Sequence, residues 1–356
     1  MFLTIITFLI VLSLLVFVHE FGHFMAAKKT GIKVDEFGFG YPPRVWGKKI
    51  GDTLYSINLL PIGGFVKLQG EDAADLNQVK DPKHSFVHKS KKVRALVIVA
   101  GVIMNFLLAV LVFSVVYTKM GIPTMTDKVN VVGLLPGAPA QQAGIKEKDV
   151  VFSVAGEKVD DTGQFIEITK RFTGQLLQIG VQRNGESLTF EVVPRESPPE
   201  GEGPLGLIVS SMEMKFYPFW QMPFRGAVEG FKEALAWLAL IVGALGGMLY
   251  QLITSASVPK DLAGPVGIFQ ITGQAAQAGV LTVLQFIGIL SVNLAVLNIL
   301  PLPALDGGRL LFIIIETVTG RRVQANAERW VHQIGMLLLL LLFLLITWND
   351  LRRIFN

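Results

Sequence analysis

The stretch VFVHEFGHF, residues 16–24, places two histidines and a glutamate at the end of an apolar run that starts at Met1. Residues 1–18 carry no charged side chain. Ionisable groups at membrane depth are costly, and they usually pair with one another, face a cavity or bind something. We therefore expect His19, Glu20 and His23 to belong to a functional site on a membrane helix.

The composition of the chain predicts an integral membrane protein. Of its 356 residues, 51% are hydrophobic and only 17% are charged, and the mean hydropathy is +0.52. These values are too apolar for an ordinary soluble protein, and the length suffices for several membrane spans plus a domain. The expected surroundings of this protein are a lipid bilayer.

Charge and cysteine content narrow the chemistry. The net charge is +4, but the 32 Lys and Arg residues are spread through loops without a basic face interleaved with aromatic residues. We therefore expect no nucleic-acid partner. The chain has no cysteine, which excludes disulfides and thiolate metal sites, so any tightly held transition metal must be bound by His, Asp or Glu.

The hydropathy pattern predicts four transmembrane helices and a fifth, marginal apolar segment at 234–250. The N-terminus lacks a basic start and a small-residue cleavage site, so we interpret it as a retained anchor. The predicted organisation is a transmembrane helix with the HEFGH motif (1–27), a cytoplasmic loop (28–94), a second span (95–118), a soluble α+β domain (121–210), a linker with a membrane-surface or re-entrant helix (211–279), a third span (280–318) and a fourth (331–348).

The distribution of basic residues predicts the orientation. Loop 28–94 contains thirteen Lys or Arg, which the positive-inside tendency places in the cytoplasm. His19 then lies about 27 Å along an inward-running helix, near the cytoplasmic face. Within the loop, residues 36–70 have the composition of short strands, with a turn at Gly51 and Asp52, and predict a small sheet. The soluble domain at 121–210 is then extracytoplasmic, and 194–206 reads as a flexible domain edge.

HEFGH fits the pattern H-E-x-x-H. On a helix, His19 and His23 share one face and can reach one zinc ion while Glu20 stands beside it as a general base. The alternative is a chance match in which buried histidines bond backbone carbonyls. A catalytic zinc takes three protein ligands and one open position, so the hypothesis requires a third ligand at the same depth.

Asp306 is the candidate for that ligand. It follows Pro301 and Pro303 in NLAVLNILPLPALDGGRLL, residues 293–311, where an apolar helix breaks, and irregular backbone at membrane depth usually lines a cavity. The alternative role of Asp306 is that of an N-cap for the next helix. If 234–250 crossed the bilayer, Asp306 would end opposite the histidines. A surface or re-entrant position brings them together, so the metal hypothesis favours four spans.

HEFGH combined with NILPLPALDGG resembles the site-2 protease family of intramembrane zinc metalloproteases, whose patterns are HExxH and NxxPxPxxDG. AGVIMNFLLA (100–109), GPVGIFQITGQ (264–274) and a PDZ-like domain also resemble the bacterial regulatory branch of the sigma-E protease type. The resemblance covers nearly the whole chain. The best-known enteric members carry two tandem PDZ domains, whereas 121–210 has room for one.

The resemblance implies a polytopic α-helical membrane protein with four transmembrane helices, a membrane-associated β-loop and an inserted extracytoplasmic PDZ-like domain. It implies zinc bound by His19, His23 and Asp306, with Glu20 as the catalytic base. The loop 36–70 resembles a re-entrant β-loop that adds the substrate as a strand, and Gly63, Gly64 and Phe65 are its expected contacts. Its alternative is a cytoplasmic lid.

Two asparagines have open roles. Asn298 could contact substrate backbone or the developing oxyanion, or it could cap the broken helix. Asn105, inside the second span, is expected to be structural and to tie that helix to a neighbour.

Substrates implied by the resemblance are single-span membrane proteins such as anti-sigma factors, or remnant signal peptides, in the bacterial cytoplasmic membrane. The PDZ-like domain could bind a peptide C-terminus at VVGLLPGAPA (131–140) or exclude bulky ectodomains, although Lys148 replaces the usual Gly before Asp149. The competing hypotheses are a transporter, which does not explain Glu20 or the PDZ-like domain, and a catalytically silent scaffold, which would lack one of the four site residues.

Overall fold

The computed structural model describes residues 1–71, 81–199, 201–255 and 264–355. The chain forms two compact units, one made of Met1–Tyr117 with Gly226–Asn356 and the other of Thr118–Arg225. Parts of the predicted cytoplasmic loop (72–80) and of the predicted linker (256–263) lie outside the described residues, as do 200 and 356.

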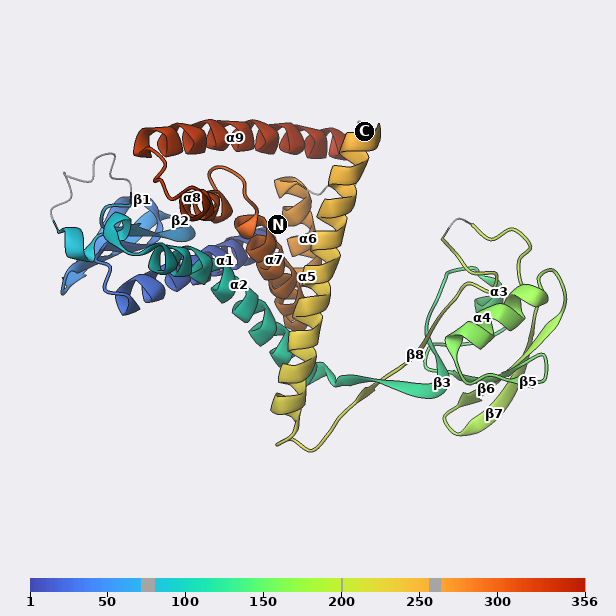
Figure 1. Cartoon of the computed structure of the whole chain (residues 1–356). Coiled ribbons are helices and arrows are strands. Elements are labelled where there is room, and N and C mark those ends of the chain that lie inside the picture. The colour runs from blue at the N-terminus through green and yellow to red at the C-terminus, as the bar shows by residue number, and fades with distance from the viewer. Residues whose placement is uncertain (72–80, 200, 256–263, 356) are drawn as a thin grey trace. The chain divides into compact units, whose positions relative to one another are not determined.

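The first unit consists of helices and one ribbon of strands (Figure 1). Five of its described helices are long and apolar enough to cross a membrane, so the chain is a multi-pass membrane protein. The sequence predicted four spans, and its marginal segment 234–250 lies inside the fifth helix, α5. The helices are α1 (Phe2–Lys29), α2 (Lys91–Met120), α5 (Met222–Ser255), α6 (Pro265–Ala278), α7 (Val280–Ile299), α8 (Asp306–Thr319) and α9 (Ala325–Phe355).

Helices α1, α2 and α7 pack together through two apolar clusters. Leu15 of α1, Leu108 of α2 and Ile287 of α7 belong to one cluster, and Phe113 and Val292 belong to the second, which α5 joins through Ala234. This packing fixes α2 beside α1, the helix that carries HEFGH.

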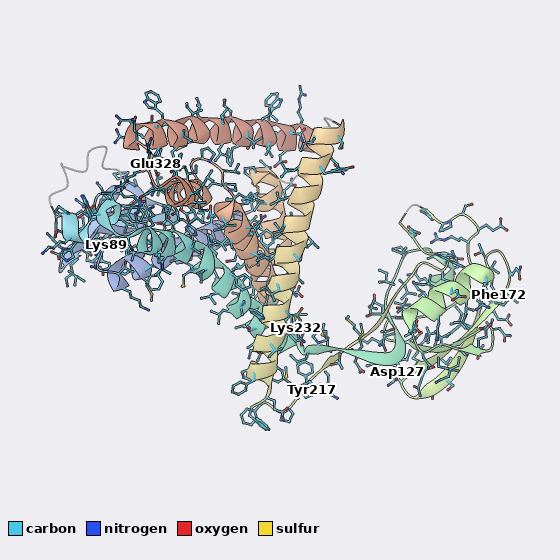
Figure 2. The ribbon with its side chains drawn as sticks, viewed as in Figure 1. Lys89, Asp127, Phe172, Tyr217, Lys232 and Glu328 are labelled. Atoms are coloured by element: carbon cyan, nitrogen blue, oxygen red, sulfur yellow. The ribbon has the colours of Figure 1, made fainter. Side chains whose placement is uncertain are left out.

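Helix α5 is long and runs in a different direction from α9 (Figure 1). It has 34 residues, which corresponds to about 51 Å, and Figure 1 shows it running across α9 instead of alongside it. The early turns of α5 are charged: Lys232, labelled in Figure 2, pairs with Glu229 at 2.7 Å, and Tyr117 donates to Glu233 at 3.0 Å.

The ribbon consists of β1 (Val34–Ile50) and β2 (Thr53–Leu68), which pair antiparallel around a turn at Gly51–Asp52, as the sequence predicted. It folds back on itself, because Phe37 faces both Tyr55 and Val66. The last part of β2, residues 64–68, is therefore paired with β1 along one edge only.

The second unit is an antiparallel sheet with the order β7-β6-β4-β3-β8, and β5 pairs with β4. Phe172, at the end of α4 (Figure 2), packs against its buried core. The elements are β3 (Ile122–Leu134), α3 (Pro139–Gln142), β4 (Val150–Val154), β5 (Glu157–Lys158), α4 (Thr162–Arg171), β6 (Leu177–Arg183), β7 (Glu186–Val192) and β8 (Leu207–Lys215).

The segment 194–206 was expected to be a flexible domain edge, but it lies inside the second unit. β8 follows it and returns to pair with β3, so the predicted domain end at residue 210 falls within a strand. Leu205 is buried in the core, and Arg195 pairs with Glu202. The two ends of this segment are therefore packed, while Glu196, Ser197 and Pro199 between them are exposed.

Asp149 is the buried anchor of this unit. Its side chain is 1% exposed and accepts hydrogen bonds from Arg183 Nε and Nη2, both at 2.7 Å, and from Lys146 N–H at 2.8 Å. Burial alone raises the pKa of the Asp149 carboxyl, but the bonds from Arg183 and Lys146 outweigh it and hold the pKa below its usual value. The ionised Asp149 carboxylate therefore stabilises the folded unit fully above the pKa of an unfolded aspartate, about 3.9. This stabilisation is lost as the pH falls through the lower pKa that Asp149 has in the folded unit.

We expect Arg183→Leu to destabilise the second unit by about 3–5 kcal/mol, because it leaves a buried carboxylate without its partner. Protease cleavage within 118–225 of the full-length protein, followed with rising temperature at pH 7, measures this. The matched control is Arg171→Leu, whose pair with Glu157 is half exposed on both sides and contributes about 0–1 kcal/mol. Equal effects of the two substitutions would contradict the assignment.

Candidate metal centre

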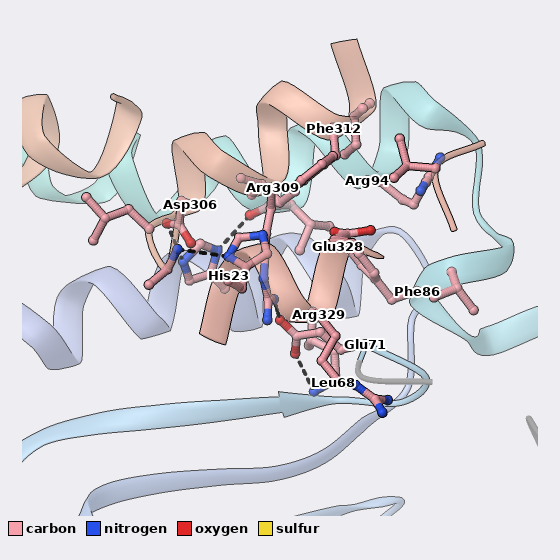
Figure 3. A pocket seen from close by; sticks show the side chains of 18 of the residues that line it. His23, Leu68, Glu71, Phe86, Arg94, Asp306, Arg309, Phe312, Glu328 and Arg329 are labelled. Atoms are coloured by element: carbon pink, nitrogen blue, oxygen red, sulfur yellow. Dashed lines mark hydrogen bonds and ion pairs between the residues drawn. The ribbon is translucent and has the colours of Figure 1, made fainter. Parts of the chain in front are cut away.

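Three ligand atoms from α1 and α8 converge on one point. His19 Nε2 and His23 Nε2 lie 3.1 Å apart, and Asp306 Oδ2 lies 3.0 Å from the first and 3.2 Å from the second. Figure 3 shows Asp306 beside His23 at one end of a cavity. The two histidines and Asp306, which lies 283 positions beyond His23 in the chain, therefore share one candidate metal site, as the sequence proposed.

The spacing of these atoms fits zinc. Zinc bonds to imidazole nitrogen and carboxylate oxygen are about 2.0–2.1 Å, so ligand atoms of a tetrahedral site stand about 3.3 Å apart. The three observed separations, 3.0–3.2 Å, approach this value. A set of three protein ligands leaves the fourth tetrahedral position for water or substrate, which distinguishes catalytic from structural zinc sites.

Asp306 lies at the start of α8, and its carboxylate points toward the two histidines. Asp306 is the first residue of the helix, and the N-cap position belongs to Leu305, which makes no side-chain cap bond. The alternative role of Asp306 as an N-cap is therefore wrong. The chain can turn back so closely because residue 307 is glycine: a Cβ there would meet Leu300 O at 2.0 Å.

Helix α2 forms a wall of the centre that the sequence analysis did not assign. His23 Nδ1 lies 2.8 Å from Val97 O, and a Cβ on Gly101 would stand 2.4 Å from His23 Nε2. Gly101 therefore leaves the space that the imidazoles occupy. In the sequence, Gly101 was visible only as a small residue within AGVIMN. That stretch indicated a resemblance to a family, but it did not indicate that Gly101 borders the histidines.

Glu20 lies beside the ligands and faces β2. Its Oε2 accepts a hydrogen bond from Val66 N–H at 3.1 Å, and it lines the cavity together with His23, Asp306 and Phe65. One turn of α1, residues 19–23, thus brings the Glu20 carboxylate and the two imidazoles close together.

Of the four residues predicted to contact substrate, Gly63, Gly64 and Asn298 are not among the residues that line this cavity. Gly63 is packed against Val16 of α1, and Gly64 against Gly38 of β1. Asn298 lies in the last turn of α7, half buried, and its side chain has no hydrogen-bond partner within the described residues. Phe65 alone of the predicted substrate set reaches the cavity wall.

The cavity has a volume of about 980 Å³ and extends from the centre to a charged far end. Figure 3 shows Arg94 there, opposite Asp306. Arg94 pairs with Glu316 of α8, and Arg309 of α8 pairs with Glu71 after β2. These ion pairs fasten the helix that begins with Asp306 to α2 and to the end of the ribbon.

Comparison with known proteins agrees with this centre. The model of peptidase family M50 matches residues 7–342, and the chain therefore belongs to this family. It is a zinc metalloprotease, and its cofactor is Zn²⁺.

Two bacterial relatives match this chain over almost the whole length of both proteins. The chain is 33% identical to the zinc metalloprotease RasP of Geobacillus kaustophilus, with 99% of this chain and 98% of the relative covered. It is 29% identical to the regulator of sigma-W protease RasP of Bacillus subtilis, with 99% of each covered. The similarity thus includes both units.

Proposed function

We propose that this protein is an intramembrane endopeptidase that hydrolyses peptide bonds within or near the transmembrane segments of membrane-anchored substrates. The observation that carries the proposal is the convergence of His19, His23 and Asp306 within about 3 Å, beside Glu20, on helices of membrane-spanning character. His19, His23 and Asp306 are the proposed zinc ligands.

The chemistry follows from the donor set. Zinc, when bound, lowers the pKa of a coordinated water toward 7 and polarises a carbonyl group. Glu20 takes the proton of the attacking water on its carboxylate and delivers it to the leaving amine. The bond from Val66 N–H to Glu20 Oε2 at 3.1 Å orients this carboxylate.

The free edge of β2 is the proposed place for an unwound substrate. A substrate helix hides its amides, so cleavage requires an extended backbone, which strand addition can hold. Alternate residues of a strand in an antiparallel pair point their N–H and C=O groups to opposite edges. Val66 donates to Glu20, and Gly64 presents its backbone groups to the same edge. Gly64 and Phe65 therefore remain proposed contacts, with Asn298 supplying an unpaired amide.

Four spans, α1, α2, α7 and α9, agree best with this site. With α5 along the membrane surface, α7 runs in the same direction as α1, and Asp306 reaches the level of His23. The charged early turns of α5, where Lys232 pairs with Glu229, support this topology. We infer a bacterial cytoplasmic membrane location, with the site toward the cytoplasm and the second unit extracytoplasmic.

The second unit is proposed to receive peptides in the manner of a PDZ domain, at β8 instead of at residues 131–140. β3 pairs with β8 over residues 130–134, and the N–H groups of Leu135, Ala138 and Ala140 already donate to backbone oxygens of this unit, whereas β8 is an edge strand of the sheet. Helix α4 stands beside β8, since Thr162 N–H bonds Ser211 Oγ at 3.2 Å. A peptide C-terminus could therefore add to β8 next to α4.

The proposed substrates are single-span anti-sigma factors or remnant signal peptides. The name of the Bacillus subtilis relative, a regulator of sigma-W protease, supports the first class. No residue of the second unit is needed for the chemistry, so it would select substrates by their terminus or by the size of their ectodomain.

The test is cleavage of a panel of single-span substrates with full and truncated ectodomains by the purified protein in detergent. We expect products cut within or next to the span, mainly from truncated substrates, and loss of cleavage with a zinc chelator that zinc restores. Cleavage confined to soluble, unfolded proteins would contradict the intramembrane assignment.

A further inference from the structure

Asn105 of α2 is a fully buried polar side chain whose carbonyl oxygen has no partner among the described residues. Its Nδ2 lies 3.4 Å from His19 Nδ1. Leaving a buried acceptor unpaired is destabilising, so packing between helices does not by itself explain an amide here.

The chemistry of His19 determines what Nδ1 needs. Its Nε2 faces Asp306 Oδ2 at 3.0 Å and His23 Nε2 at 3.1 Å, so Nε2 is the metal-facing nitrogen. A neutral imidazole has one proton, and the nitrogen that binds a metal must offer its lone pair. The proton therefore sits on Nδ1, which requires a hydrogen-bond acceptor.

Only one orientation of the Asn105 amide supplies that acceptor. The oxygen and nitrogen of an asparagine exchange places by a half-turn about the last side-chain bond. With Nδ2 toward His19, two N–H groups face each other. With Oδ1 toward His19, the imidazole N–H is satisfied and the unpaired oxygen gains its partner.

We propose that Asn105 is a positioning residue of the metal centre. Its Oδ1 accepts from His19 Nδ1–H and so holds the imidazole in the tautomer and orientation that aim Nε2 at zinc. This inference rests on the proposed ligand set and adds to it a residue that the sequence analysis considered structural.

The arrangement of α2 supports this role. Val97, Gly101 and Asn105 are four residues apart, so they lie on one face of the helix. Val97 O stands 2.8 Å from His23 Nδ1, and Gly101 leaves room for the rings. One helical face thus offers an acceptor to each imidazole, and such partners orient metal-binding histidines in many proteins.

The test compares zinc affinity in the full-length protein, measured by chelator competition in detergent. Asn105→Leu removes the acceptor, and we expect it to weaken zinc binding about 10–100-fold. Asn105→Asp keeps an acceptor oxygen in the same place, and we expect it to retain tight binding. Ser291→Ala is the matched control, because Ser291 Oγ donates to the backbone oxygen of Asn105 at 2.8 Å and does not touch the amide.

Thermal unfolding of the zinc-free proteins separates a packing effect from a positioning effect. The proposal is overturned if Asn105→Leu binds zinc like the wild type, if Asn105→Asp loses zinc, or if Ser291→Ala loses as much affinity as Asn105→Leu. If Asn105→Leu does not fold, the zinc affinity of Asn105→Asp tests the proposal. Asp306→Ala tests the ligand set separately, since retained tight binding there would overturn the proposed site whatever Asn105 does.

Discussion

Glu20→Gln is expected to leave zinc bound and to reduce peptide cleavage about 10²–10⁴-fold, the range of general acid–base catalysis. The amide has nearly the shape of the carboxylate, and its oxygen can still accept from Val66 N–H, the bond that Glu20 makes at 3.1 Å. It cannot take the proton of the attacking water. Initial cleavage rates of a truncated single-span substrate, with zinc content determined on the same samples, measure the effect.

The matched control for this experiment is Glu36→Gln. Glu36 lies in β1 and accepts from Ser56 Oγ at 2.6 Å, so it makes one hydrogen bond of its own but does not line the cavity. Near wild-type cleavage by the Glu36 variant would exclude a general effect of losing a carboxylate in this region. Comparable cleavage by the Glu20 variant and the wild type would remove Glu20 as the base.

Gly101→Ala is expected to reduce turnover about 10²-fold, the usual result of moving a reacting group by about 1 Å. The added methyl carbon would stand 2.4 Å from His23 Nε2 and 2.7 Å from His19 Cε1, closer than real contacts allow, so the imidazoles must shift. Alanine is also the better helix former, by about 1 kcal/mol. A loss of activity and of zinc affinity would therefore come from the centre, and both are measured on one preparation.

Gly246→Ala in α5 is the control, because a Cβ at that position meets no atom within 4 Å. It adds the same methyl group to another long apolar helix of the same unit. Unchanged zinc affinity and turnover in Gly101→Ala would show that α2 is not a wall of the metal site.

The proposed histidine ligands were predictable because their signal is local. Positions four apart on a helix share a face whatever the rest of the chain does, so HEFGH defined the pair His19 and His23. Asp306 followed from chemistry, because a catalytic zinc requires a third protein ligand. It lies where an apolar helix breaks, and irregular backbone at membrane depth usually lines a cavity. Whether Asp306 lies at the same membrane depth as the histidines depended on the topology. The sequence did not decide the topology, because segment 234–250 could either cross the bilayer or lie along its surface.

The partners of these ligands were not predictable, because they depend on which helices touch. Nothing in the sequence indicates that Val97 O faces His23, or that a glycine and an asparagine of α2 border the imidazoles. Likewise, the edge position of β8 became visible only with the sheet order, and it moves the proposed peptide site from 131–140 to β8.

The sequence by itself determined the class of protein, the residue types proposed to bind zinc and the helix that carries the proposed base, because composition and helical spacing are properties of short stretches. Only the tertiary structure decided that Asp306 begins a helix at 3.0 Å from His19, that Val66 binds Glu20, and that α2 closes the centre. These contacts join residues far apart in the chain, and they exist only when the helices pack in one particular order.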